Sequence, residues 1–219
     1  VHPTLEYSLV LLKEQDEILL LAADLVGDAM NRYGIAEDGF EVIATAKGAA
    51  FGQIDESKAA PFSVQHPFMP APDGGVKRVP VITGDHVTAD SGTGSVHTAP
   101  MHGADDFVVS KRFGVNSDDM LVGGDGHFIS TPALDALELS GLSSADKGNF
   151  RVLGILAEKG ALLKKENIKH SYPHCWRHKS PIIFRATPQW FISMKQNGLL
   201  EQAMHEVENT VEWRPGWGK

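Results

Sequence analysis

Hydrophobic and polar positions in the first 47 residues predict a hairpin, a helix and a third strand. "EYSLVLLKEQDEILLLA" (residues 6–22) has two leucine-rich or β-branched runs separated by a charged stretch, which is typical of a hairpin. "AADLVGDAMNRYG" (residues 22–34) spaces its apolar residues as a helix does and ends in a glycine, a common helix stop. "FEVIATAK" (residues 40–47) predicts a further strand.

The middle of the chain alternates between loop signals and short elements. Residues 52–78 are rich in proline and contain a Gly-Gly pair, so we expect a loop there. "RVPVITGDHVT" (residues 78–88) and "GSVHTA" (residues 94–99) predict short strands on either side of a Gly-Thr-Gly turn. "ADDFVVSKRFG" (residues 104–114) has helical spacing, with acidic residues early and basic residues late, and predicts a helix.

The last part of the chain carries fewer strand signals. Two more strands are expected near Met120 and Phe128. "DKGNFRVLGILAEKG" (residues 146–160) predicts a helix, and "ALLKKENIKHSY" (residues 161–172) predicts a strand. A last helix is expected over residues 193–209.

Together these elements indicate an α+β protein. Many short strands with few helices favour a β-barrel-like core or curled sheet decorated with short helices. Residues 173–192 are rich in proline and aromatic side chains, which marks a change of character. We therefore expect one domain over residues 1–172 and a helical or irregular exit segment over residues 173–219.

Composition places the chain among ordinary globular proteins. Of its 219 residues 42% are hydrophobic and 22% charged, and no apolar run approaches the roughly eighteen residues of a membrane span. We therefore expect no membrane partner. A single cysteine, Cys175, excludes an internal disulfide and fits a reducing compartment, so we expect a cytoplasmic protein. Because the first residue is Val1 rather than Met, we also expect a piece of a longer chain.

Charge is distributed unevenly. Residues 1–150 hold 9 basic and 22 acidic side chains, a balance of −13, whereas residues 151–219 hold 11 and 6, a balance of +5, and the two give the −8 of the whole chain. A basic end can face an acidic partner. An ordinary solvated surface with uneven charge is the simpler interpretation. A general nucleic-acid coat is not expected, because it needs many clustered lysines and arginines.

The stretch "GTGSVHTAPMHGADDF" (residues 92–107) concentrates candidate chemistry. Gly92 and Gly94 flank Thr93, and glycines there allow positive φ and close approach of a ligand to main-chain N–H groups. A plain hairpin turn explains the same glycines equally well, so the turn alone does not establish a site.

A histidine and two carboxylates follow that turn. His97 alternates with Val96, so the two side chains face opposite sides of the expected strand, and a lone strand histidine is more often structural. Asp105 and Asp106 stand in the first turn of the expected helix, where the helix dipole favours carboxylates for structural reasons alone. Since neighbouring helical residues point in different directions, one of the two can face a cleft.

Taken together, these groups suit binding and water-mediated hydrolysis better than covalent catalysis. A carboxylate would bind an ammonium group, and donors from the turn would hold a carbonyl or hydroxyl. Ser95 and Thr98 lack an evident base with its orienting partner, so an enzyme built on this stretch would position water.

A metal site is the weaker alternative. "HSYPHCWRH" brings His174, Cys175 and His178 together, and Cys175 to His178 has the spacing of half a zinc site. With no other cysteine, the second half would need histidines or carboxylates, so we expect no bound metal.

The quoted stretch resembles a motif in the editing insertion of the isoleucyl, valyl and leucyl class I aminoacyl-tRNA synthetases. His97 in "GSVHTAP" looks isoleucyl, since the valyl enzymes tend to carry Lys there and the leucyl ones Met. "HSYPHCWRHKSPIIFRATPQWFISM" (residues 170–194) is similar to the segment by which the isoleucyl chain leaves its editing insertion. "VEWRPGWGK" (residues 211–219) resembles the run that re-enters the nucleotide-binding catalytic domain.

The resemblance implies a proofreading reaction, the hydrolysis of valine from the 3′ end of tRNA(Ile). Asp106 would bind the α-ammonium group, and His97 would lie beside the amino-acid side chain and the ester and help to exclude isoleucine. The isoleucyl enzymes are themselves the standard illustration of the need, since one missing methylene gives only about 150-fold discrimination. Further substrate-binding positions would be Gly92, Thr93, Gly94, Val96, His102 and Asp105.

The same resemblance bounds the cofactors and partners. Editing needs no cofactor, and ATP and Mg belong to the aminoacylation site, whose signatures this chain lacks. The partners would be the tRNA(Ile) 3′ end carrying valine and the rest of the synthetase chain.

One feature departs from the family pattern. The insertion also has a threonine-rich segment before its first hairpin, whereas Thr4 is the only threonine before position 45 here. We therefore expect an incomplete pocket and slow hydrolysis by the isolated fragment, and the alternative is a non-catalytic module that positions the tRNA 3′ end. A free-standing hydrolase is disfavoured by "WRPGWGK", which looks like a chain running into a larger body.

Overall fold

A computed structural model describes residues 1–71, 73–115, 120–169 and 171–218. The chain divides into two compact units, Val1–Arg185 and Ala186–Lys219, which are described separately below. Among the described residues, every helix is too short or too polar to cross a membrane. The predicted division at residue 172 concerns domains of a longer protein and stays a prediction.

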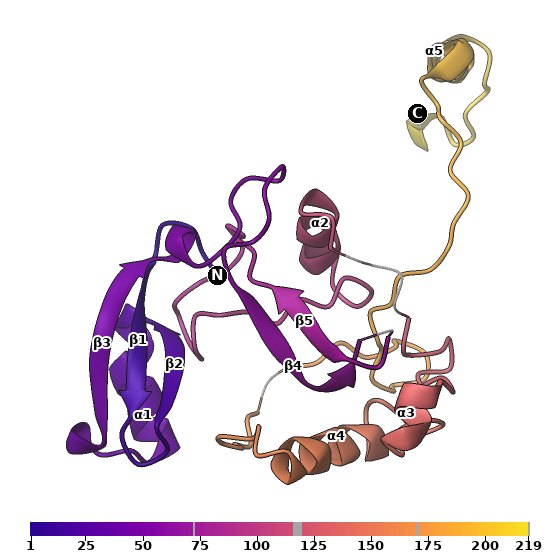
Figure 1. Ribbon diagram of the computed structural model, residues 1–219. Coiled ribbons are helices and arrows are strands. Elements are labelled where there is room, and N and C mark those ends of the chain that lie inside the picture. Colours follow the sequence, from indigo (N-terminus) through magenta and orange to yellow (C-terminus); the bar gives the residue numbers. More distant parts are fainter. Residues whose placement is uncertain (72, 116–119, 170, 219) are drawn as a thin grey trace. The chain divides into compact units, whose positions relative to one another are not determined.

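The first sheet confirms the predicted hairpin, helix and third strand. Strands β1 (Glu6–Leu12), β2 (Glu17–Ala22) and β3 (Phe40–Lys47) pair antiparallel in the order β2-β1-β3. Helix α1 (Val26–Tyr33), entered through the 3₁₀ turn η1 (Ala23–Leu25), packs on the sheet (Figure 1). Their shared core consists of Val10, Leu12, Leu21, Val26, Ala29 and Met30. Burial of these side chains in the central strand and the helix holds this part together.

A second sheet lies where a loop was expected. Strands β4 (Ser63–Pro70) and β5 (Val76–Pro80) pair antiparallel inside the proline-rich stretch, so the prediction of a loop over residues 52–78 is wrong for much of its length. The prolines fit because both strands of a two-stranded sheet are edges, where a missing N–H donor is tolerated. The pairing slips between Gln65 and Pro70.

Three helices complete the first unit. Helix α2 (Ala104–Arg112) and helix α4 (Lys147–Glu158) were both predicted, and α3 (Pro132–Ala136) is an addition. Thr131 caps α3, because its hydroxyl accepts the N–H of Leu134 at 3.2 Å. A core of Leu134, Leu139 and Ile155, to which Phe68 and Met69 of β4 add, joins α3 and α4 to the second sheet.

Several expected strands are absent from the described residues, and with them the barrel. Residues 94–99 and the described part of 161–172 are irregular, and residue 170 lies outside the described residues. The strands expected near Met120 and Phe128 reduce to a single bridge between Val122 and Phe128. The α+β class is confirmed, but the described residues form only small open sheets, and no closed barrel is found among them.

The short 3₁₀ turns join these elements. In the first unit they are η2 (Glu37–Gly39) before β3 and η3 (Gly48–Ala50) after it. In the second unit they are η4 (Gln196–Gly198) before the last helix and η5 (Gly216–Gly218) near the end of the chain.

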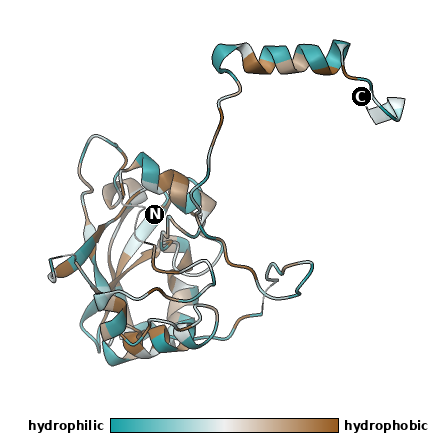
Figure 2. Ribbon diagram, turned by 90° about the vertical axis from the view of Figure 1, so that its right-hand side faces the viewer, coloured by the Kyte–Doolittle hydropathy of each residue, from teal (hydrophilic) through white to brown (hydrophobic). Residues whose placement is uncertain are grey.

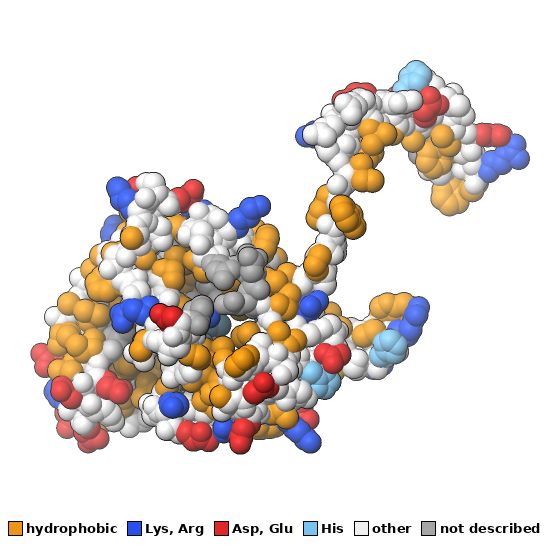
Figure 3. Space-filling model, turned by 45° about the vertical axis from the view of Figure 1, so that its right-hand side comes forward, with side chains coloured by type: hydrophobic (Ala, Val, Ile, Leu, Met, Phe, Trp, Pro, Cys, Tyr) orange, Lys and Arg blue, Asp and Glu red, His pale blue; other side chains and the backbone are white. Residues whose placement is uncertain are grey.

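The second unit is built around one amphipathic helix. Helix α5 (Leu199–Asn209) is shorter than predicted, because Asn197 and Gly198 have positive φ and interrupt the helix that was expected from residue 193. Hydrophobic residues recur along α5 among hydrophilic ones (Figure 2). Large apolar side chains stand exposed before the helix as well, with Trp190 100% and Phe191 87% exposed (Figure 3).

Candidate functional site

The Gly-Thr-Gly turn is bonded to the first sheet. The carbonyl of Thr93 accepts the N–H of Ala22 at 2.9 Å, and the carbonyl of Gly94 accepts the buried hydroxyl of Tyr7 at 2.6 Å. Gly94 has φ of +70° and packs so closely that an added Cβ would overlap the Cβ of Ala22. Burial raises the pKa of the Tyr7 phenol, although the hydrogen bond from the N–H of His2 lowers it. This hydroxyl therefore stays a neutral donor to the turn.

His97 follows in the exposed, irregular segment after the turn. Val96 beside it is 47% exposed. The charge of His97 acts on His66 of β4, a residue that the sequence did not single out. The ring of His66 is partly buried, which lowers its pKa most, and the nearby charges of Lys77 and His97 lower it further. His97 and His66 therefore share one local electrostatic environment.

The backbone determines which nitrogen of His66 carries the proton. Its Nδ1 accepts the N–H of Met69 at 3.0 Å and that of Phe68 at 3.3 Å. A ring nitrogen that accepts has no proton, so the neutral ring carries its proton on Nε2. The lowered pKa and these two bonds both favour this neutral form. Through these bonds His66 supports the stretch of β4 where the pairing with β5 shifts, and His66 lies within electrostatic reach of His97.

His102 is held by a distant segment of the first unit. Its Nδ1 lies 3.0 Å from the carbonyl oxygen of Phe184, and the neighbouring Arg185 donates from Nε to the carbonyl of Val122 at 3.0 Å. The motif, through His102, and the chain that follows it, through Val122, are thereby tied to residues 184–185. A substrate-binding role for His102 stays a prediction.

The two carboxylates at the start of α2 differ in their surroundings. Asp106 is partly buried and its side chain folds back over Gly103. If Gly103 carried a side chain, its Cβ would lie only 2.5 Å from Oδ2 of Asp106. Asp105 is exposed. The two therefore face different environments, as their helical spacing predicted, and Asp106 is the one enclosed by the chain.

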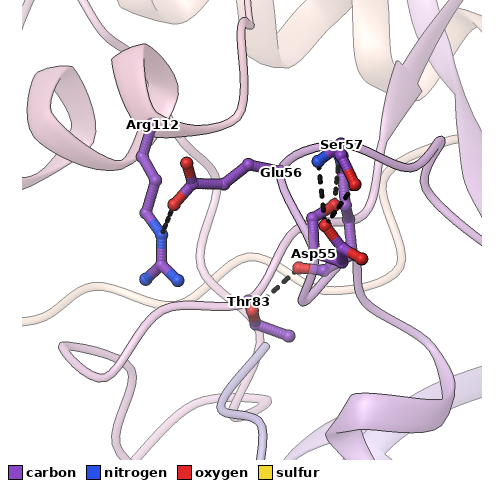
Figure 4. Close-up of polar contacts among 6 residues, drawn as sticks. Asp55, Glu56, Ser57, Thr83 and Arg112 are labelled. Carbon is purple, nitrogen blue, oxygen red and sulfur yellow. Dashed lines mark hydrogen bonds and ion pairs between the residues drawn. The ribbon is translucent and has the colours of Figure 1, made fainter.

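The other end of α2 is attached to the turn after η3. Arg112 donates from Nε to Glu56 at 2.8 Å, and the neighbouring Asp55 accepts the backbone N–H and the hydroxyl of Ser57 (Figure 4). These bonds from Ser57, followed by the contact with Lys58, lower the pKa of Asp55. Both members of the Arg112–Glu56 pair are about half exposed, so the pair orients the helix more than it stabilises the fold.

The structure thus places the predicted site residues in three local settings. The turn is bonded to the sheet, His97 lies within electrostatic reach of His66, and Asp106 covers Gly103. Among the described residues, no hydrogen bond or ion pair joins His97 to Asp106. A shared ligand for His97 and Asp106 therefore stays a prediction.

The surface hollows formed by the described residues of the first unit include the following two. One, of about 150 Å³, is lined by residues of the turn, of α1 and of the stretch after α4: Gly92, Thr93, Ala29, Arg32, Tyr33, Lys164 and Glu166. The other, of about 300 Å³, lies at Asp125, His127 and Phe128, away from the motif. Only the smaller hollow includes predicted site residues.

Cys175 and His178 do approach each other, as their spacing predicted. The thiol Sγ lies 3.4 Å from Nδ1 of His178 and accepts that residue's N–H at 3.4 Å. Within the described ranges, no three His, Cys, Asp or Glu side chains converge as a metal site requires. His170 lies outside those ranges, and the expectation of no bound metal stays a prediction.

Known proteins match the chain from end to end. It is 46% identical over 220 residues to the isoleucine–tRNA ligase of Thioalkalivibrio sulfidiphilus. It is 44% and 42% identical over 221 residues to those of Coxiella burnetii and Erwinia tasmaniensis. Each match covers 100% of this chain and 21% of the relative. The chain is homologous to one region of isoleucine–tRNA ligases.

The relatives are the isoleucyl ligases that the motifs suggested. The homology covers both units of the chain, which spans about a fifth (21%) of the length of these relatives. No family model matches the chain.

Proposed function

We propose that this chain is the editing segment of an isoleucine–tRNA ligase, which hydrolyses the ester of valine misattached to tRNA(Ile). The observation that carries the proposal is the segment 92–107 in a chain homologous to these ligases throughout. Its glycine turn is bonded to the sheet, with Gly94 buried, whereas His97 is exposed and Asp106 only partly buried. A purely structural hairpin does not require those two residue types.

Asp106 is the anchor for the α-ammonium group of the amino acid. Its carboxylate is partly enclosed by the backbone at Gly103, so a bound ammonium group would lose less of the interaction to solvent than at a fully exposed acid. A charge-assisted contact of this kind contributes roughly 1.5–3 kcal/mol. The ester is thereby held at a defined distance from the neighbouring groups.

His97 lies beside the amino-acid side chain and limits its size. The difference between valine and isoleucine is one methylene, so the pocket must reject the larger side chain by its shape. His97 and Val96 are exposed on the irregular segment. The flexible 3′ end of a tRNA can therefore reach the part of the pocket that His97 would form. The synthetase body would supply most other phosphate contacts.

The reaction itself needs only an oriented water. Its oxygen attacks the ester carbonyl, the bond between the carbonyl carbon and the ribose oxygen breaks, and the ribose hydroxyl leaves with a proton. Valine and uncharged tRNA are the products. An aminoacyl ester is already activated, so holding it and the water in place supplies much of the acceleration.

The rest of the ligase is the partner for the second unit. Trp190, Phe191 and Trp217 are almost wholly exposed, which leaves a large apolar surface in a chain that covers a fifth of its relatives' length. We infer that in the ligase these side chains pack on parts of the protein outside this segment.

Comparison of Asp106→Ala with Asp105→Ala in the full-length ligase tests the proposal. The first change should abolish deacylation of valyl-tRNA(Ile), because the ammonium anchor is lost, and leave isoleucine-dependent ATP–pyrophosphate exchange near normal. The second removes the same charge from the exposed neighbour and should have a much smaller effect. Wild-type deacylation by Asp106→Ala would exclude the assignment, and weaker tRNA binding without slower hydrolysis would favour the non-catalytic positioning module.

A further inference from the structure

The hollow beside the glycine turn brings together three segments that are far apart in sequence. Arg32 and Tyr33 come from the end of α1, Gly92 and Thr93 from the turn, and Lys164 from the stretch after α4. The turn is held to the sheet by buried bonds, and α1 packs on the same sheet, so two of the three walls are rigid. The hollow is therefore a feature of the fold.

The charges around this hollow contrast with the rest of the unit. Residues 159–169, from which Lys164 and Glu166 line the hollow, hold four lysines and one glutamate, whereas residues 1–150 carry a balance of −13. Asp28 binds Nε of Arg32 at 3.0 Å and so orients the guanidinium group. Arg32 and Lys164 thus offer two cations at one place, with Glu166 as the single carboxylate of the lining and Asp28 outside the lining offsetting part of the charge of Arg32. The guanidinium group, oriented by Asp28, and the ammonium group of Lys164 can together bind an anion.

The size of the hollow limits what the anion can be. At about 150 Å³ it is smaller than the roughly 300–1,000 Å³ of pockets that enclose a whole drug-sized ligand. It fits a single charged group of a larger molecule, with the remainder lying on the surface. An oriented guanidinium beside a lysine is a common way to bind a phosphate.

The position of the hollow points to nucleic acid. Thr93 lines it, and His97 follows four residues later, so at most about 14 Å of chain separates the two. One or two nucleotides span such a distance. We propose that Arg32 and Lys164 bind a backbone phosphate of the single-stranded tRNA 3′ end, a short way from the ester held at His97 and Asp106. This inference rests on the proposed function and adds the contact that guides the strand to the site.

The direct test is binding of an RNA minihelix with a single-stranded CCA end to the full-length ligase. Arg32→Gln combined with Lys164→Gln should weaken binding roughly 2- to 25-fold, as expected for two exposed ion pairs. The slope of log affinity against log salt should fall by about 1.4, for two lost contacts with a single strand. The KM for deacylation of valyl-minihelix should rise while kcat is little changed.

A second double variant controls for net charge. Lys13→Gln with Lys147→Gln removes the same two charges from the same unit, at positions outside the hollow. It should leave affinity and salt slope as in the wild type. Equal losses in both double variants, or none in either, would overturn the proposal.

Inorganic phosphate distinguishes the two sources of the anion. If it binds at the hollow while minihelix affinity is unaffected by Arg32→Gln and Lys164→Gln, the site takes free anions and the RNA contact is wrong. Asp106→Ala, measured in parallel, separates this result from the proposed function. If Asp106→Ala loses deacylation but the Arg32 and Lys164 variant binds the minihelix normally, only the phosphate site is refuted. If Asp106→Ala deacylates normally but the Arg32 and Lys164 variant binds the minihelix more weakly, only the editing assignment is refuted.

Discussion

The two ends of the segment 92–107 relate differently to the fold. Gly92–Gly94, which we call the anchored half, gives its carbonyls to Ala22 and Tyr7 and leaves no room for a side chain at position 94. His97–Asp106, the open half, is irregular up to α2 and keeps its imidazole and carboxylate toward solvent or the adjacent backbone. Residues only a few positions apart thus belong to the framework in one case and to the proposed site in the other.

This difference shows how a reactive segment can be positioned without being rigid throughout. The anchored half restrains where the open half begins, and α2 with its Arg112–Glu56 pair restrains where it ends. Substitutions in the anchored half should therefore lower stability first. Substitutions in the open half should change activity or selectivity while the free energy of unfolding stays nearly constant.

Gly94→Ala should have the largest effect on stability. The added methyl group overlaps Ala22, and alanine resists the φ of +70°, so we expect a loss of roughly 2–5 kcal/mol in the free energy of unfolding. Gly92→Ala is the matched control, since Gly92 has a similar φ of +75° but no atom within 4 Å of the added group. It should cost only about 1–2 kcal/mol. Denaturant unfolding measures both losses of free energy. Equal losses in the two variants would refute close packing at Gly94.

Tyr7→Phe should have the next largest effect. It removes the hydroxyl that donates to Gly94 and leaves a buried carbonyl without that donor, at a cost of roughly 1–3 kcal/mol. Tyr33→Phe removes a hydroxyl for which the described residues provide no hydrogen bond, and it should be nearly neutral. Thermal unfolding distinguishes them, and similar midpoints would mean that the Tyr7 bond does not hold the turn.

The sequence correctly predicted the strands, helices and carboxylate environments that depend on the local pattern of residues. The leucine-rich runs of β1 and β2, the spacing in α1 and the early acids and late bases of α2 all identified their elements. The same local reasoning placed Asp105 and Asp106 in different surroundings.

The errors came from contacts between distant residues. Tyr7 and Gly94 are 87 positions apart, so nothing in the motif revealed that the turn would bond to β1 instead of leading into a strand over 94–99. Pro67 and Pro70 argued against a strand, but in β4 they lie on an edge, where proline is tolerated. His66 carried no signal of its own, because its importance arises from a backbone step and from the approach of His97.

His97→Ala tests the open half through selectivity. It should change the ratio of valyl-tRNA to isoleucyl-tRNA deacylation by about tenfold or more, either by slowing valine removal or by admitting isoleucine. The free energy of unfolding should stay within about 0.5 kcal/mol of the wild type, since the side chain is exposed. Unchanged rates with both charged tRNAs would return His97 to a structural role.

His66 should give the smallest effect, visible only as a dependence on pH. Its folded pKa lies below the ordinary value of about 6.5, so the unfolded chain binds the proton more tightly. The stabilisation from neutral His66 is therefore complete above about pH 6.5 and is lost as pH falls through the lowered pKa. His66→Asn keeps a hydrogen-bond acceptor but does not titrate, so its stability should fall less between pH 7 and about pH 5. Parallel curves for the two proteins would contradict this.

The most direct test of the account measures deacylation and stability together for one variant from each half. Valyl-tRNA(Ile) deacylation per folded molecule and the free energy of unfolding would be determined for Asp106→Ala and Gly94→Ala in the full-length ligase. The account predicts that Asp106→Ala loses deacylation with unchanged stability, whereas Gly94→Ala loses stability. Wild-type deacylation by a fully folded Asp106→Ala protein would contradict it.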